Sequence, residues 1–140
     1  MKQHSTNYYK TLITVAEDTR AVAGVIPAKK SKTPTIGYMQ FEMITTSPFT
    51  YTSDELTFNI HVIRAGIPAS EISNERQRFF SKGQPCLRTS ALAKSYGWGI
   101  YANQEGKINL IDMASEEYRT LLKDVNVTKV SAMRSKKEKS

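Results

Sequence analysis

Residues 98–113, WGIYANQEGKINLIDM, decide the fold class because they form the clearest β-hairpin pattern of the chain. Two runs rich in apolar, aromatic and β-branched residues, 98–102 and 107–113, flank the tetrapeptide 103–106. That tetrapeptide ends in Gly106, and glycine adopts the positive φ of a tight turn at little cost. We therefore expect two antiparallel strands joined by this turn.

Two further segments are predicted to be strands of the same small antiparallel sheet. Residues 9–15 are rich in residues that favour strands and follow a two-residue alternation. Residues 127–130 add a short final strand. Directly after the first of these strands, residues 17–32 contain glycine, proline and lysines and indicate a long surface connection.

Residues 53–64 carry conflicting signals. Apolar residues at every second position from 56 to 62 are typical of a strand. Thr52 and Glu55, however, have the spacing of a helix capping box, and Gly66 is typical of a helix end. Because two independent end signals favour it, we predict a helix here, with a strand as the alternative.

Residues 34–45 show the same conflict. Thr33 and Pro34 are typical of an N-cap and a first helical residue, since proline there loses no hydrogen bond. The alternation of apolar residues over 39–43 leaves a strand as the alternative. We predict a helix.

Three more helices are predicted from their end signals. Residues 70–82 are expected to pair with 53–64 as a helical hairpin. Residues 90–96 form a short helix, and Ser115 caps a C-terminal helix at 116–123, with acids in its first turn. Helices and strands that are segregated along the chain predict an α+β fold.

Length and charge set the domain organisation. The chain has 140 residues, a normal length for one domain, and a net charge of +7. Residues 125–140 carry five cations and one acid and so supply +4 of that charge. We expect a single α+β domain over residues 1–133 and a basic, disordered tail over 134–140.

The composition argues against several classes of protein. One cysteine cannot form an internal disulfide, and one cysteine with two histidines is too few for a structural zinc site. No apolar run approaches the roughly 18 residues of a membrane span, and the N-terminus lacks an apolar signal region. We predict a cytoplasmic protein without metal, cofactor or membrane association. No pattern predicts an oligomeric state.

We expect a functional site in residues 76–99, RQRFFSKGQPCLRTSALAKSYGWG. This stretch holds the only cysteine, the only tryptophan and five cations, and no Asp or Glu occurs from 76 to 104. The candidate ligand-binding residues are three cations and two aromatic residues: Arg78, Lys82, Arg88, Tyr96 and Trp98. Arginine and lysine side chains hold phosphate or carboxylate, and aromatic rings give a flat apolar surface. The prediction is non-enzymatic binding of an anionic small molecule or protein partner, with a solvated helix face and a core tryptophan as the alternative.

Cys86 is the candidate catalytic residue of a second hypothesis, a thiol-dependent enzyme or redox sensor. It lies between Lys82 and Arg88, and neighbouring cations favour the reactive thiolate. A nucleophile also needs a base, for which the chain offers His4 and His61. The alternative is a buried, inert cysteine that only packs.

A third hypothesis is nucleic-acid binding through the basic surface and tail. The net charge supports it, since cations attract phosphates over long distances. No nucleic-acid-binding motif is present in the sequence, so this function is the least favoured of the three.

Several segments of the sequence match a known protein family. They are FFSKGQPCLR at 79–88, YGWGI at 96–100, NYY at 7–9, YTSD at 51–54 and AMRSK at 132–136. With them the chain resembles a family of small bacterial proteins known only as a domain of unknown function. The resemblance extends over nearly the whole chain, and it implies a stand-alone single domain with no known activity.

Overall fold

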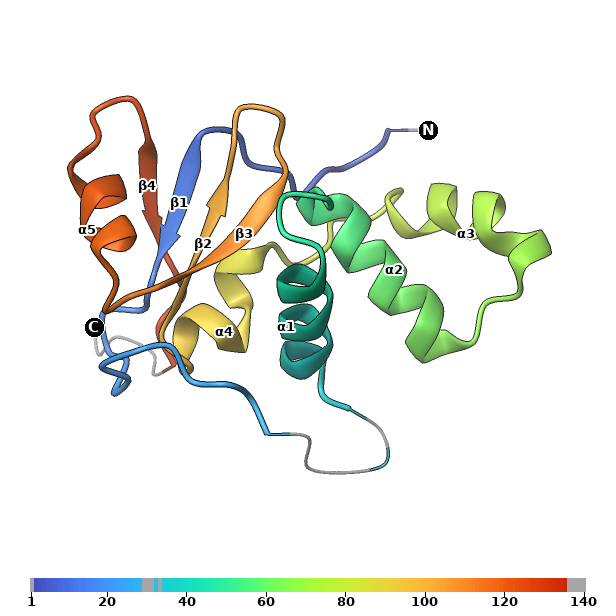
Figure 1. Ribbon diagram of the computed structural model, residues 1–140. Coiled ribbons are helices and arrows are strands. Elements are labelled where there is room, and N and C mark those ends of the chain that lie inside the picture. Colours follow the sequence, from blue (N-terminus) through green and yellow to red (C-terminus); the bar gives the residue numbers. More distant parts are fainter. Residues whose placement is uncertain (1, 29–31, 33, 136–140) are drawn as a thin grey trace, which may run out of the picture.

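The computed structural model describes residues 2–28, 32 and 34–135, and these form one α+β domain, as predicted (Figure 1). In chain order the strands and α-helices are β1 (Thr11–Thr14), α1 (Ile36–Thr46), α2 (Ser53–Ala65), α3 (Ile72–Phe79), α4 (Ala91–Lys94), β2 (Trp98–Ala102), β3 (Ile108–Asp112), α5 (Glu116–Lys123) and β4 (Thr128–Ser131). No helix among the described residues is long and apolar enough to cross a membrane. Of the predicted disordered tail, residues 136–140 lie outside the described part of the chain.

The four strands form one sheet in the order β3-β2-β1-β4. β2 runs antiparallel to β1 and β3, but β4 runs parallel to β1 and pairs Val130 with Ile13. The sheet is therefore mixed, whereas the sequence predicted an antiparallel one. The connection explains the difference. β3 already runs in the direction of β1, and a helical crossover through α5 returns the chain in that same direction.

The sheet separates two apolar clusters. Leu12 and Ile13 of β1 point to opposite faces because side chains alternate along a strand. Leu12 packs with Tyr118 of α5 and with Val127. Ile13 belongs to the larger cluster, which contains buried residues of α1, α2 and α4. Figure 1 shows α5 beside β4, and α1, α2 and α4 grouped together away from it.

Helix α2 has both of the end signals that predicted it. The Thr52 hydroxyl accepts a hydrogen bond from the Glu55 backbone N–H, and the Glu55 carboxylate accepts one from the Thr52 N–H. Gly66 ends the helix in the left-handed conformation, with φ of 66°. A helix rather than a strand is thus confirmed at 53–64.

The alternating apolar residues of α2 serve two different faces of the helix. Leu56 and Ile60 lie one turn apart and pack in the main core. Phe58 points elsewhere and packs against Phe79 and Phe80, with ring centroids 5.7 and 6.2 Å away. The two-residue alternation therefore comes from two helical contacts and not from a strand.

Helix α1 is confirmed but begins later than predicted. Its N-cap is Thr35, whose hydroxyl accepts from the Tyr38 N–H at 3.2 Å. Pro34 consequently precedes the helix instead of opening it, and Thr33, the predicted cap, lies outside the described residues.

Two other helices are shorter than predicted. The segment predicted at 70–82 starts as a 3₁₀ turn, Ala69–Glu71, and its α-helical part, α3, ends at Phe79. The N–H of Phe80 is shared between two carbonyl groups of the last turn, which closes the helix there. Residues 80–90 cross back to the body of the protein, where Ser90 caps the single turn of α4.

Candidate functional site

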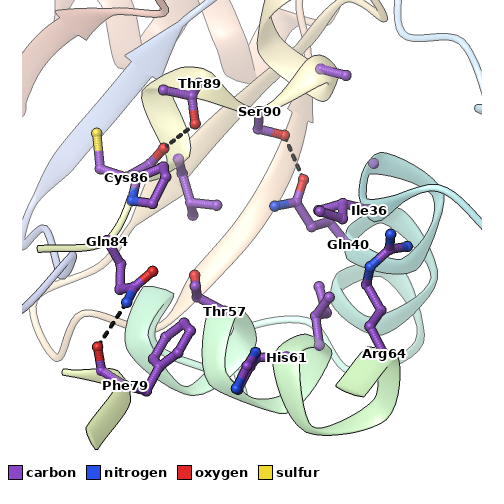
Figure 2. Close-up of a pocket in the computed structure, with 15 residues that line it drawn as sticks. Ile36, Gln40, Thr57, His61, Arg64, Phe79, Gln84, Cys86, Thr89 and Ser90 are labelled. Atoms are coloured by element: carbon purple, nitrogen blue, oxygen red, sulfur yellow. Dashed lines mark hydrogen bonds between the residues drawn. The ribbon is translucent and has the colours of Figure 1, made fainter. Parts of the chain in front are cut away.

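A cavity of about 480 Å³ lies between α1, α2 and residues 84–91 (Figure 2). Its apolar walls are formed mainly by Ile36, Ile60, Phe79, Pro85, Leu87 and Ala91. The uncharged polar residues that line it are Gln40, Thr57, Gln84, Thr89 and Ser90. More than half of the lining residues come from the 76–99 stretch that the sequence singled out, while α1 and α2 supply the others.

Gln40 presents a buried amide to the cavity. The residue is only 7% exposed, and its Oε1 accepts a hydrogen bond from the Ser90 hydroxyl at 2.6 Å. Ser90 Oγ also accepts from the Leu92 N–H as the α4 cap, so its own proton is directed to the Gln40 carbonyl. With its oxygen bonded to Ser90, Gln40 points Nε2 into the cavity, where this nitrogen has no protein partner among the described residues (Figure 2).

Two more polar groups are directed into the same space. Gln84 Nε2 donates to the Phe79 carbonyl at 2.7 Å, which leaves Gln84 Oε1 facing the cavity (Figure 2). The Thr57 hydroxyl also points inward and has no hydrogen-bond partner among the described residues. Of these three side chains, Gln40 can donate through its nitrogen, Gln84 can accept through its oxygen, and the Thr57 hydroxyl can do either.

The basic residues that line the cavity, His61 and Arg64 of α2, both contact other protein groups. His61 Nε2 lies 2.7 Å from Glu75 Oε2, and the Phe79 ring stacks on the imidazole with centroids 4.6 Å apart. Glu75 also pairs with Arg78. Arg64 donates from Nη1 to the Pro34 carbonyl at 3.0 Å. Among the described residues no group of three or more His, Cys, Asp or Glu side chains could hold a metal ion.

Cys86 lies in the cavity wall, but its sulfur faces another group. The Tyr8 hydroxyl donates to Cys86 Sγ at 3.4 Å, and Figure 2 shows the sulfur pointing away from His61 and Gln40. Burial, followed by the hydrogen bond to Cys86, raises the pKa of Tyr8 to about 12. The thiol is thus the neighbour of a neutral phenol and not of a histidine.

The three cations predicted to hold an anion do not line the cavity. Arg78 has 75% of its side chain exposed and pairs with Glu75 one turn away. Lys82 is exposed beyond the end of α3. Arg88 donates from Nε to the Ser131 carbonyl at 2.6 Å, and its own carbonyl accepts from the Met133 N–H. Arg88 therefore fastens the end of β4.

The two predicted aromatic residues hold the long connection over 17–28. Trp98 Nε1 donates to the Val25 carbonyl at 2.9 Å, and the indole packs on Phe41 with ring centroids 5.6 Å apart. The Tyr96 carbonyl accepts from the Val25 N–H. Gly24 is required because a Cβ there would lie 2.7 Å from the Trp98 ring. Of the predicted site residues, only Cys86 belongs to the cavity.

The fold and the cavity together define an α+β protein with a partly open cavity of about 480 Å³. The chain belongs to a family of unknown function, DUF6157, whose model matches residues 3–138. This match confirms the predicted resemblance to a domain-of-unknown-function family. No curated protein and no solved structure matches the chain. The function therefore has to be argued from the cavity itself.

Proposed function

We propose that this protein binds a small, partly apolar organic molecule in the cavity between α1, α2 and residues 84–91. The observation that carries the proposal is the Gln40 amide, which is buried and directs its N–H groups into the cavity. Its nitrogen is accessible from the cavity, because no fully buried side-chain nitrogen or oxygen among the described residues lacks a partner. A ligand that accepts a hydrogen bond from Gln40 takes the place of water at this nitrogen, while the amide oxygen is bonded to Ser90.

The size and lining of the cavity support the same function. Small-molecule sites in proteins typically have volumes of roughly 300–1,000 Å³, apolar walls and a few oriented polar groups. The cavity here has about 480 Å³ and combines apolar side chains with the hydrogen-bonded amides of Gln40 and Gln84. Apolar walls supply affinity through burial, and the amides select among ligands of similar shape.

Thiol chemistry at Cys86, nucleic-acid binding and a negative charge on the ligand all stay predictions of the sequence. Arg64 is the cation that lines the cavity, while the predicted anion ligands lie elsewhere. For thiol chemistry at Cys86, the supporting observation is the hydrogen bond that the Tyr8 hydroxyl donates to the thiol sulfur. Nucleic-acid binding rests on net charge alone.

The proposal is tested with three probes of similar size, namely toluene, benzamide and benzoate. Each is titrated into the full-length protein while backbone amide signals are followed by two-dimensional NMR. We expect at least one probe to bind, with the largest shifts at Gln40, Thr57 and Ala91. If none of the three probes binds, or if the shifts map to another face, the proposal is overturned.

A cavity-filling variant provides the control for location. At Gly37 an added Cβ would meet only the Ala91 Cβ, at 3.4 Å, and leucine favours a helix more than glycine does. Gly37→Leu should therefore fold, fill part of the cavity and remove probe binding. The matched control is Gly83→Leu, since a Cβ at Gly83 meets no atom within 4 Å and Gly83 does not line the cavity. Binding that survives Gly37→Leu would place the probe elsewhere.

A further inference from the structure

We infer that the ligand carries a neutral carboxamide or lactam group, which Gln40 and Gln84 recognise together. This inference rests on the proposed binding function and adds the chemical class of the ligand. The ligand carbonyl accepts from Gln40 Nε2, and the ligand N–H donates to Gln84 Oε1. The Thr57 hydroxyl, directed into the same space, adapts to either group.

The two amides face the cavity with opposite ends. The Phe79 carbonyl can only accept, so Gln84 must turn its nitrogen toward that carbonyl and its oxygen toward the cavity. Gln40 accepts from the Ser90 hydroxyl through its oxygen and turns its nitrogen toward the cavity. A flip of Gln84 would place its oxygen against the Phe79 carbonyl and lose a hydrogen bond of 2.7 Å, whereas a flip of Gln40 would reverse its hydrogen bond with the Ser90 hydroxyl, which can also accept.

A charged ligand fits this pair less well. A carboxylate could accept from Gln40, but it has no proton for Gln84 Oε1, and two oxygens facing each other are unfavourable. An ammonium or amidinium group has the opposite conflict with the N–H groups of Gln40. Of the basic side chains that line the cavity, His61 contacts Glu75 and Arg64 uses one of its five N–H groups on the Pro34 carbonyl. A neutral group with both a donor and an acceptor satisfies both amides.

The remainder of the ligand is expected to be apolar and flat. Phe79 lines the cavity with a ring whose orientation is fixed by stacking on His61, 27° from parallel. Ile60 and Leu87 are buried in the main core and line the cavity as well. A planar apolar body packs against such walls, so an aromatic or cyclic amide is the class of ligand that the site suits.

The test compares the affinities of benzamide, benzoate and toluene by NMR titration. We expect benzamide to bind about five- to tenfold more tightly than either of the others, the effect of one net hydrogen bond of roughly 1–1.4 kcal/mol. Equal affinity of benzamide and toluene would overturn the inference, as would tighter binding of benzoate. In both cases the proposed binding function would stand. No binding of any probe would overturn the function itself.

Two variants show whether the amides are responsible. Gln40→Met and Gln84→Met keep the length of each side chain and remove its amide. Each should reduce the preference for benzamide over toluene to near unity while toluene still binds, which shows that the cavity is intact. Gln77→Met, at an exposed position of α3, is the matched control and should leave the preference unchanged. A preference that persists in both cavity variants would overturn the inference, and either variant alone suffices if the other does not fold.

Discussion

Tyr8 and Cys86 form a contact of distinctive chemistry at the cavity wall, where the sulfur points away from Gln40 and His61. The phenol donates to the thiol at 3.4 Å, and the contact joins the N-terminal segment to the loop that precedes α4. Burial is the largest cause of the raised pKa of Tyr8, and the hydrogen bond to Cys86 adds to it. The neutral phenol is therefore the form that the folded protein favours.

This preference predicts how stability changes at high pH. The pKa of Tyr8 rises from 10.0 to about 12 on folding, so the folded state holds the proton more tightly. Its contribution to stability is complete below pH 10 and is lost as the pH rises from 10 to 12. Tyr8→Phe cannot ionise and should lose less stability over that range than the wild type. Urea unfolding at a series of pH values measures the difference.

The control for this experiment is Tyr9→Phe, at an adjacent tyrosine that is 56% exposed. Its stability should change with pH as that of the wild type does, because this variant keeps Tyr8. Cys86→Ala should lower the pKa of Tyr8 but not restore its ordinary value, because burial remains. Parallel curves for wild type and Tyr8→Phe would show that Tyr8 does not contribute.

At the scale of single residues, the sequence could locate one wall of the cavity but not the polar side chains that α1 and α2 supply to it. The 76–99 stretch stands out by composition, and its residues 84–91 do form one wall. Gln40 and Thr57 lie in other helices, and no motif marks a glutamine whose amide is bonded to a distant serine. The sequence could not show either that the predicted cations lie outside the cavity, since Arg88 donates to a backbone carbonyl that only the fold brings near.

Among the elements, helices were predicted better than strand pairing because their signals are local. The Thr52–Glu55 capping box and the Ser115 cap involve residues three apart, so the sequence shows them directly. The pairing of β4 with β1 joins residues more than a hundred positions apart, and it depends on the path of the crossover. Local chemistry fixes the ends of α2, but only the assembled sheet fixes the direction of β4.

Arg88 links two elements, and its removal should loosen β4. Arg88→Ala deletes the hydrogen bond to the Ser131 carbonyl, which should cost about 1.5–3 kcal/mol of unfolding free energy, as for hydrogen bonds to charged groups. The amide proton of Ala132, which bonds to the Thr14 carbonyl, should exchange faster with solvent. Hydrogen exchange followed by NMR measures this directly.

Lys94→Ala is the matched control for Arg88→Ala, because it removes a cation from the same stretch outside the β4 contact. It should leave the exchange of Ala132 unchanged. Added phosphate should not stabilise the wild type through Arg88, because the guanidinium is held by the backbone. Stabilisation by phosphate that disappears in Arg88→Ala would instead restore the role of an anion ligand for this residue.

For the molecule as a whole, the sheet couples two apolar clusters of unequal size. Gly99 of β2 lies where the smaller cluster meets the sheet, since an added Cβ there would lie 2.6 Å from the Tyr118 ring and 3.3 Å from Leu12. Its neighbour Ile100 faces the larger cluster on the other side. A disturbance at Gly99 should therefore be transmitted to both faces.

Gly99→Ala tests whether the two clusters unfold together. Alanine suits a strand better than glycine, so any loss of stability comes from the clash, and overpacking of this kind costs about 1–3 kcal/mol. Trp98 fluorescence reports on the face that carries Phe41, and circular dichroism reports on all helices, including α5. Both signals should change at the same, lower urea concentration, because one sheet carries both clusters.

The control is Gly83→Ala, where the added Cβ meets no atom within 4 Å, and it should leave the unfolding midpoint unchanged. Separate midpoints in Gly99→Ala would mean that the α5 layer unfolds independently of the cavity-bearing core.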